Sequence, residues 1–108
     1  MTILNTVYSN AKKSIYEEVA KLIMQRKKLL NYIKILRNIA INITTTPTEI
    51  ASILSIERNT AFKYLKYLQE RAIIRSKNGK YYIADPLIRR ALREPDAKDQ
   101  ILEILKKF

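Results

Sequence analysis

Apolar residues near the N-terminus repeat every three or four positions, which is the spacing of one helical face. The first set is Ile15, Val19, Leu22 and Ile23, and the second is Leu29, Ile33, Leu36 and Ala40. The pattern predicts helical structure over both sets. Because neither Pro nor Gly separates them, the sequence does not locate a break between two helices.

The segment TPTEIASILS contains a clear helix start. Thr46 fits the N-cap, Pro47 fits the first helical position, and Glu49 fits the third residue of a capping box. The apolar positions of this short helix are Ile50, Ala51 and Leu54. The turn SIE follows directly and leads into another helical pattern.

The segment RNTAFKYLKYLQERA predicts a longer amphipathic helix. Its narrow apolar stripe is formed by Ala61, Leu65, Leu68 and Ala72. The opposite face carries Asn59, Lys63, Lys66 and Glu70, and the shoulders carry Thr60, Phe62 and Tyr67. This polar face is either a surface that contacts a partner or simply the solvated side of the helix.

The pattern then changes to two short strands, IIRSK and KYYIA. Asn78-Gly79 between them predicts a two-residue type I′ hairpin, and Gly79 is the only glycine in the chain. Asp85 and Pro86 fit the N-cap and first position of the next helix, PLIRRALR. A last helix begins after Pro95, with an apolar face of Ile101, Ile104, Leu105 and Phe108.

This order of elements predicts a mainly α protein with a small β-hairpin wing: a winged helix-turn-helix with extra N- and C-terminal helices. Core positions of such a unit fall on Ile50, Ala51, Leu54, Ile56, Ala61 and Tyr64. Ser55 stands at a turn position where Gly is preferred, and Glu57 stands where Ser or Thr often caps the second helix. We expect one domain over residues 1–108: a helical extension (1–28), the winged-helix core (29–93) and a C-terminal helix (94–108).

The stretch TPTEIASILSIERNTAFKYLKYLQERAIIRSKNGKYYIADPLIRRAL resembles an archaeal winged-helix domain. It is most similar to the domain that ends a large group of archaeal AAA+-type ATPases, and YIKILRNIA resembles their linker. The resemblance covers residues 30–93, and KYYIADPLIRR is its most specific part. A chain with one Gly has no G-x-x-x-x-G-K phosphate loop, so the ATPase itself is absent. The chain is either a free-standing winged helix or a domain of a longer protein.

The net charge is +11, from 21 Lys and Arg against 10 Asp and Glu. A polyanionic partner would relieve this self-repulsion. The alternative is a general bias of composition, since Ile, Lys, Asn and Tyr are all plentiful. The basic excess is confined to residues 1–93, because residues 94–108 carry 3 basic and 4 acidic side chains.

If the winged-helix prediction is correct, the helix over about 58–71 enters the major groove of double-stranded DNA. Asn59, Lys63 and Lys66 then face the bases, and an Asn amide pairs with adenine. Phosphates or base edges are expected at Arg58 and Thr60, and phosphates at Thr46 and Thr48. The wing, residues 75–80, brings Arg75, Lys77, Asn78 and Lys80 to the DNA backbone. Tyr67 stays open between packing and base stacking.

The sequence contains neither Cys nor His, which excludes disulfides, most metal sites and nucleophile–base dyads. We therefore expect no enzyme, no cofactor and no metal. No apolar run suits a membrane span and no signal peptide is recognisable, so a cytoplasmic protein is expected. The main function expected is that of a DNA-binding transcriptional regulator. The alternative is a protein-interaction or dimerisation module, such as the docking domain of a larger ATPase. A homodimer through the N- and C-terminal helices is compatible with either.

Overall fold

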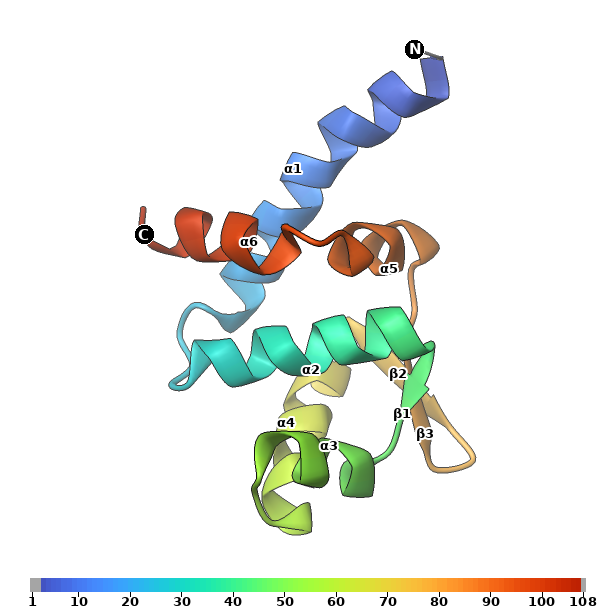
Figure 1. Ribbon diagram of the computed structural model, residues 1–108, viewed down its shortest axis with the longest axis vertical. Helices are drawn as coiled ribbons and strands as arrows, with labels where there is room; N and C mark the ends of the chain where they lie inside the picture. Colours follow the sequence, from blue (N-terminus) through green and yellow to red (C-terminus); the bar gives the residue numbers. More distant parts are fainter. Residues whose placement is uncertain (1–2, 108) are drawn as a thin grey trace.

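The computed structural model describes residues 3–107 (Figure 1). Within this range the chain forms six helices and three short strands, so the protein is mainly helical with a small antiparallel sheet. The elements are α1 (Ile3–Ile23), α2 (Leu29–Asn42), β1 (Thr44–Thr45), α3 (Pro47–Leu54), α4 (Arg58–Glu70), β2 (Ile74–Lys77), β3 (Lys80–Ile83), α5 (Pro86–Arg93) and α6 (Ala97–Leu105).

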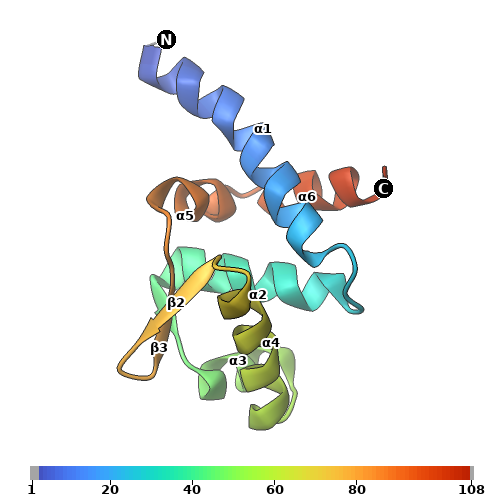
Figure 2. The same ribbon diagram turned by 180° about the vertical axis from the view of Figure 1, so that it is seen from behind.

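Helix α2 separates two groups of elements (Figures 1 and 2). On one side α1 crosses α6, with α5 beside them, and the N-terminal part of α1 projects beyond the rest of the molecule. On the other side lie α3, α4 and the tip of the β2–β3 hairpin. We call these the α1/α6 end and the α4 end.

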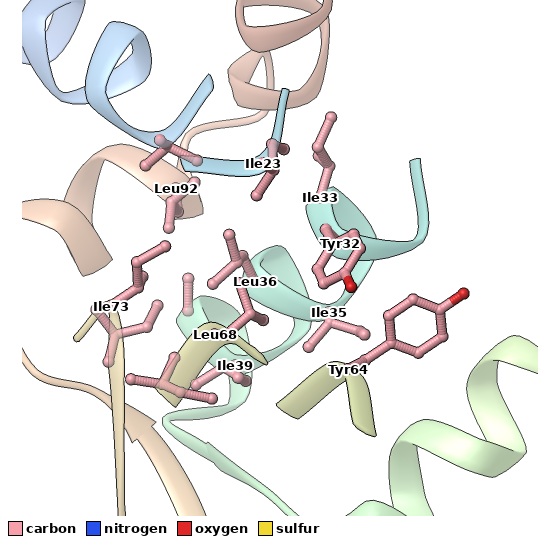
Figure 3. Close-up of a cluster of buried hydrophobic side chains, with 14 of the residues drawn as sticks. Ile23, Tyr32, Ile33, Ile35, Leu36, Ile39, Tyr64, Leu68, Ile73 and Leu92 are labelled. Carbon is pink, nitrogen blue, oxygen red and sulfur yellow. The ribbon is translucent and has the colours of Figure 1, made fainter. Parts of the chain in front are cut away.

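Helix α2 has a broad apolar face that is buried by the elements packed against it. Its buried residues are Tyr32, Ile33, Ile35, Leu36, Ile39 and Ala40. Side chains from both ends converge on it: Ile23 and Leu92 from one group, and Leu68 and Ile73 from the other (Figure 3). One hydrophobic core therefore joins both ends of the molecule.

The break that the sequence leaves unplaced falls between Ile23 and Leu29. Lys28 has φ 59° and ψ 47°, a left-handed conformation that reverses the chain just before α2. Such a conformation is unfavourable for a residue with a Cβ atom, so the turn depends on surrounding contacts. No Pro or Gly marks the break, because Lys28 takes the conformation for which Gly is usually preferred.

The predicted helix starts at Thr46 and Asp85 are confirmed. The Thr46 hydroxyl accepts a hydrogen bond from the Glu49 backbone N–H at 3.2 Å, and Asp85 Oδ1 accepts one from the Leu87 N–H at 2.8 Å. The capping box at Glu49 is wrong in one respect. Its carboxylate accepts from the Thr45 hydroxyl at 3.2 Å instead of returning to the Thr46 N–H, because β1 places Thr45 beside it.

The predicted hairpin is also confirmed. Asn78 and Gly79 both have positive φ, 54° and 78°, as a type I′ turn requires. The sequence did not predict β1, whose Thr44 and Thr45 pair with Tyr82 and Tyr81 to give the strand order β1-β3-β2. Two threonines next to a helix cap carry too little pattern to indicate a strand.

Two further expectations need correction or restriction. Ala72 does not belong to the apolar stripe of α4, because the helix ends at Glu70 and Ala72 is exposed with φ 63°. Its conformation allows the Ile73 N–H to bond to the Leu68 carbonyl at 3.2 Å, which closes the helix end. In α6, Ile101 is buried and Ile104 and Leu105 pack against the core, whereas Phe108 lies outside the described residues.

Candidate nucleic-acid interface

The turn between α3 and α4 is tight and is closed by backbone hydrogen bonds. Ser55 has φ 54° and ψ 49°, the left-handed geometry for which the sequence would favour Gly. The Ile56 N–H bonds to the Ala51 carbonyl at 3.0 Å, and the Ser55 N–H bonds to the Ser52 carbonyl at 3.4 Å. These two bonds form a Schellman motif, which fixes the direction in which α4 leaves α3.

Helix α4 begins after Glu57, whose side chain makes no capping hydrogen bond, as its identity suggested. The two predicted faces of the helix are confirmed, except for Ala72. Ala61, Leu65 and Leu68 are buried in the core. The outward face is exposed and consists of Asn59, Lys63, Lys66 and Glu70. Arg58 at the helix start is also exposed, and Thr60 is half-buried.

The three aromatic residues of α4 have different environments. Tyr64 is buried, with its ring edge-on to Tyr32 at 4.8 Å between centroids, and its hydroxyl accepts from the Asn31 amide at 3.2 Å. That hydroxyl points away from the apolar cluster (Figure 3). Phe62 remains 47% exposed. The expectation that Tyr64 packs in the core is therefore confirmed.

Tyr67 links α4 to the end of α1. Its hydroxyl donates a hydrogen bond to the Leu22 carbonyl at 2.7 Å. The guanidinium groups of Arg26 and Arg71 each lie 4.6 Å from its ring centroid, and the Tyr32 ring contacts it edge-on. These contacts explain Tyr67 by packing, and a role on nucleic acid stays a prediction.

The hairpin tip presents a second basic surface. Arg75, Lys77, Asn78 and Lys80 are all exposed, and Lys77 pairs directly with Lys80 across the two strands. Like charges in directly opposed positions destabilise a hairpin, so an anion at this tip would relieve the repulsion. The Gln69 amide donates to the Ser76 hydroxyl at 3.1 Å and ties the hairpin to α4.

Thr46 and Thr48 lie at the start of α3. The Thr46 oxygen already accepts the capping hydrogen bond, although its O–H remains a donor. Thr48 is exposed. Of the predicted residues, the structure therefore groups those of α4 on one exposed face and those of the hairpin around its tip, while Thr46 and Tyr67 also have structural roles.

Ion pairs are scarce among the described residues. In the described part of the chain, the only ion pair within 4.0 Å joins Lys106 and Glu103 of the C-terminal segment. Accordingly, Lys63 and Lys66 of α4 and the basic residues of the hairpin have no carboxylate partner at that distance. These side chains are all exposed to solvent.

The sequence reasoning missed a group of residues beside α4. Gln25, Arg26, Lys27 and Lys28, which connect α1 to α2, line a pocket of about 420 Å³ together with residues of α2 and α4. The signal was present in the sequence as the run RKK. It was not assigned because roughly thirty positions separate it from the α4 residues that it meets in space.

No protein-family model, no curated protein and no solved structure matches this chain. Among residues 3–107, no group of three or more Asp, Glu, His or Cys side chains is placed to hold a metal ion. A search of the same residues finds no helix with the length and apolarity needed to cross a membrane.

Proposed function

We propose that this protein is a winged helix-turn-helix DNA-binding protein of the transcription-regulator type. In this proposal α3 and α4 are the helix-turn-helix, α4 enters the major groove, and the β2–β3 hairpin is the wing. The observation that carries the proposal is the set of exposed basic residues that α4 and the hairpin present at one end of the molecule.

The shape of the α4 end supports this assignment. The major groove is about 12 Å wide and admits a single α-helix. Helix α4 has 13 residues and turns its apolar stripe inward, which leaves Asn59, Lys63 and Lys66 on the outer face. The hairpin tip projects on the same side of α2 as α4 (Figures 1 and 2). A duplex lying against α4 would therefore meet the hairpin along its backbone.

The charges predict how binding responds to salt. Arg58, Lys63 and Lys66 on α4 and three basic residues of the hairpin are exposed: Arg75, Lys77 and Lys80. Each phosphate contact releases counterions and contributes about 0.9 to the slope of log affinity against log salt. If all six residues engage phosphates, the slope is about −5. Any lysine that contacts a base instead of a phosphate reduces the magnitude of this slope, since a base contact releases no condensed counterion.

The test is fluorescence anisotropy on a labelled generic duplex at several salt concentrations, with an excess of unlabelled competitor. We expect micromolar or tighter binding at low salt for the wild type. The double variant Lys63→Ala/Lys66→Ala should bind several-fold more weakly. The matched control Lys98→Ala/Lys107→Ala removes the same charge from the α1/α6 end. An equal loss in both variants would assign the binding to net charge instead of α4, and no binding by the folded wild type would contradict the proposal.

Two exposed apolar residues favour a second candidate function, docking to another protein. Ile53 of α3 is 53% exposed and Phe62 of α4 is 47% exposed. A winged helix that ends a larger ATPase would present such residues to the partner domain. Absence of duplex binding together with a folded wild type would favour this alternative.

The homodimer expected through the N- and C-terminal helices stays a prediction, but the structure restricts it. Buried side chains of α1, including Val19 and Ile23, face the core together with Ala97 and Ile101 of α6. These apolar faces already meet within one chain. Size-exclusion chromatography with light scattering measures whether the remaining surface of the two helices supports a stable dimer.

A further inference from the structure

A basic pocket lies between the α1–α2 connection and α4. Its volume is about 420 Å³, and its lining includes Arg26, Lys27 and Lys28 on one side and Thr60 and Lys63 on the other. This volume falls within the roughly 300–1,000 Å³ typical of small-molecule sites. All four basic side chains are exposed, and no Asp or Glu lines the pocket. The pocket thus has the charge for an anion and the space for one.

Two phenol groups add hydrogen-bond donors to the lining. The Tyr32 hydroxyl accepts a hydrogen bond from Arg26 Nε at 3.2 Å, and the Tyr64 hydroxyl accepts one from the Asn31 amide at 3.2 Å. Each hydroxyl uses its oxygen as the acceptor in these bonds, so each retains its own hydrogen to donate. The two rings are held by their edge-on contact. The lining therefore offers donors from rigid as well as flexible groups.

Two contacts with tyrosines orient the Arg26 side chain. Its guanidinium group lies over the Tyr67 ring, 4.6 Å from the centroid, while its Nε bonds to Tyr32. The hydrogen bond with Tyr32 raises the pKa of Arg26 further above its ordinary value. The two terminal nitrogens are not used in that bond, and such a fork suits a phosphate. The left-handed backbone at Lys28 then turns the chain at the edge of the same pocket.

We propose that this pocket binds a phosphate group. Two sources have this chemistry: a backbone phosphate of bound DNA, or the phosphate of a small phosphorylated molecule. Thr60 and Lys63 belong both to the pocket and to the proposed DNA surface, so a free phosphate compound would compete with DNA. The DNA source rests on the proposed function, whereas binding of a free phosphate does not.

The first measurement is a titration with inorganic phosphate at constant ionic strength, followed by the amide resonances of the ¹⁵N-labelled protein. We expect saturable shifts confined to residues 25–28 and 60–64. The variant Lys27→Gln/Lys28→Gln should lose this response, and it alters only exposed side chains. Arg26→Gln is a second variant, with its fold checked by circular dichroism because Arg26 also packs on Tyr67. The control Lys98→Gln/Lys107→Gln should respond like the wild type.

The second measurement is duplex binding by the same variants over a range of salt. If DNA supplies the phosphate, Lys27→Gln/Lys28→Gln lowers the magnitude of the salt slope by about 0.9, the value for one phosphate, and the control does not. A lost phosphate response with unchanged duplex binding assigns the pocket to a small molecule.

The outcomes separate the two proposals. Phosphate binding by a protein that binds no duplex would contradict the proposed function and leave the pocket assignment intact. No phosphate response, together with equal duplex binding by the pocket variant and the control, would overturn the pocket assignment.

Discussion

Arginines at one end of the molecule and lysines at the other have different contacts. At the α1/α6 end, arginines bond to the protein itself: Arg37 donates to the Leu92 and Glu94 carbonyls at 3.3 and 3.2 Å, and Arg89 donates to the Ala40 carbonyl at 3.2 Å. At the α4 end, Lys63 and Lys66 project from the outer face of their helix without a carboxylate partner. Some of the charge therefore supports the fold, while the rest remains available to a partner.

Tyrosines of α1 also make contacts within the protein. Tyr16 of α1 donates to the Ala91 carbonyl at 2.6 Å, and the Arg90 guanidinium lies 3.7 Å from the Tyr8 ring centroid. These contacts bind α1 to α5. The difference teaches that a net charge of +11 does not by itself locate a function. Exposed lysines without an ion pair occur at both ends, so the assignment to the α4 end rests on the helix-turn-helix arrangement proposed for α3, α4 and the hairpin.

The largest expected effect is a loss of stability that leaves duplex binding unchanged. Ile101 is fully buried where α6 meets the core, so Ile101→Ala should lower the free energy of unfolding by about 2–5 kcal/mol. Urea denaturation followed by circular dichroism measures this loss. The salt slope of duplex binding by the folded variant should not change. A change in that slope would show that the two ends are not independent.

Charge reversal tests the opposite end. Lys63→Glu/Lys66→Glu should weaken duplex binding at least about tenfold, because it replaces attraction to phosphate with repulsion. Both residues are exposed, so the free energy of unfolding should change by less than about 0.5 kcal/mol per residue. The control Lys98→Glu/Lys107→Glu makes the same change of net charge on the α1/α6 end. Anisotropy and urea denaturation of all three proteins decide whether position or total charge matters.

A smaller effect is expected at Tyr16. The variant Tyr16→Phe removes a buried hydrogen bond and should cost about 1 kcal/mol of stability at neutral pH. Burial also raises the pKa of Tyr16 above its ordinary value of 10.0. The unfolded chain then releases this proton more readily than the folded one. The stabilisation is fully present below the unfolded pKa and is lost as pH rises above about 10.

Urea denaturation at neutral and alkaline pH tests whether stability falls as the pH rises. The wild type should lose stability more steeply above about pH 10 than Tyr16→Phe does. Some alkaline loss should remain in the variant, because burial also raises the pKa of Tyr8. Parallel pH profiles for the two proteins would contradict the assignment to Tyr16.

The smallest expected effect is an increase in stability. Ala72 adopts φ 63° after α4, where a Cβ atom is unfavourable, so Ala72→Gly should raise stability by about 0.5–1 kcal/mol. Ala51→Gly inside α3 should instead lower it by about 1 kcal/mol. Thermal unfolding of both variants measures the difference. Destabilisation by Ala72→Gly would show that its methyl group contributes more than its backbone costs.

Much of the element order was predictable because local signals specify it. Thr46 and Asp85 act as caps, and Asn78-Gly79 forms the turn that its sequence requires. The missed features depend on contacts between distant segments. Strand β1 exists because β3 offers it a partner, and Tyr67 is held by a carbonyl 45 positions away. No local pattern encodes either contact.

The candidate site also contains residues that the sequence predicts and residues that it does not. The outward face of α4 follows from helical periodicity, so Asn59, Lys63 and Lys66 were found from the sequence. The pocket at Arg26 was not, because it requires the α1–α2 connection to fold back against α4. Sequence periodicity places residues on a face, but it does not show which segment lies next to that face.

The chain makes its tight connections almost without glycine, and this affects the free energy of association. Among residues 3–107, five residues with a Cβ atom have positive φ: Lys28, Ile43, Ser55, Ala72 and Asn78. The whole sequence contains one Gly. A chain poor in glycine has fewer conformations when unfolded, so it loses less conformational entropy on folding. In the folded protein, α4 and the hairpin are formed by hydrogen bonds within the chain, including the bond from Gln69 to Ser76. Binding to the α4 end then requires little further ordering of the backbone.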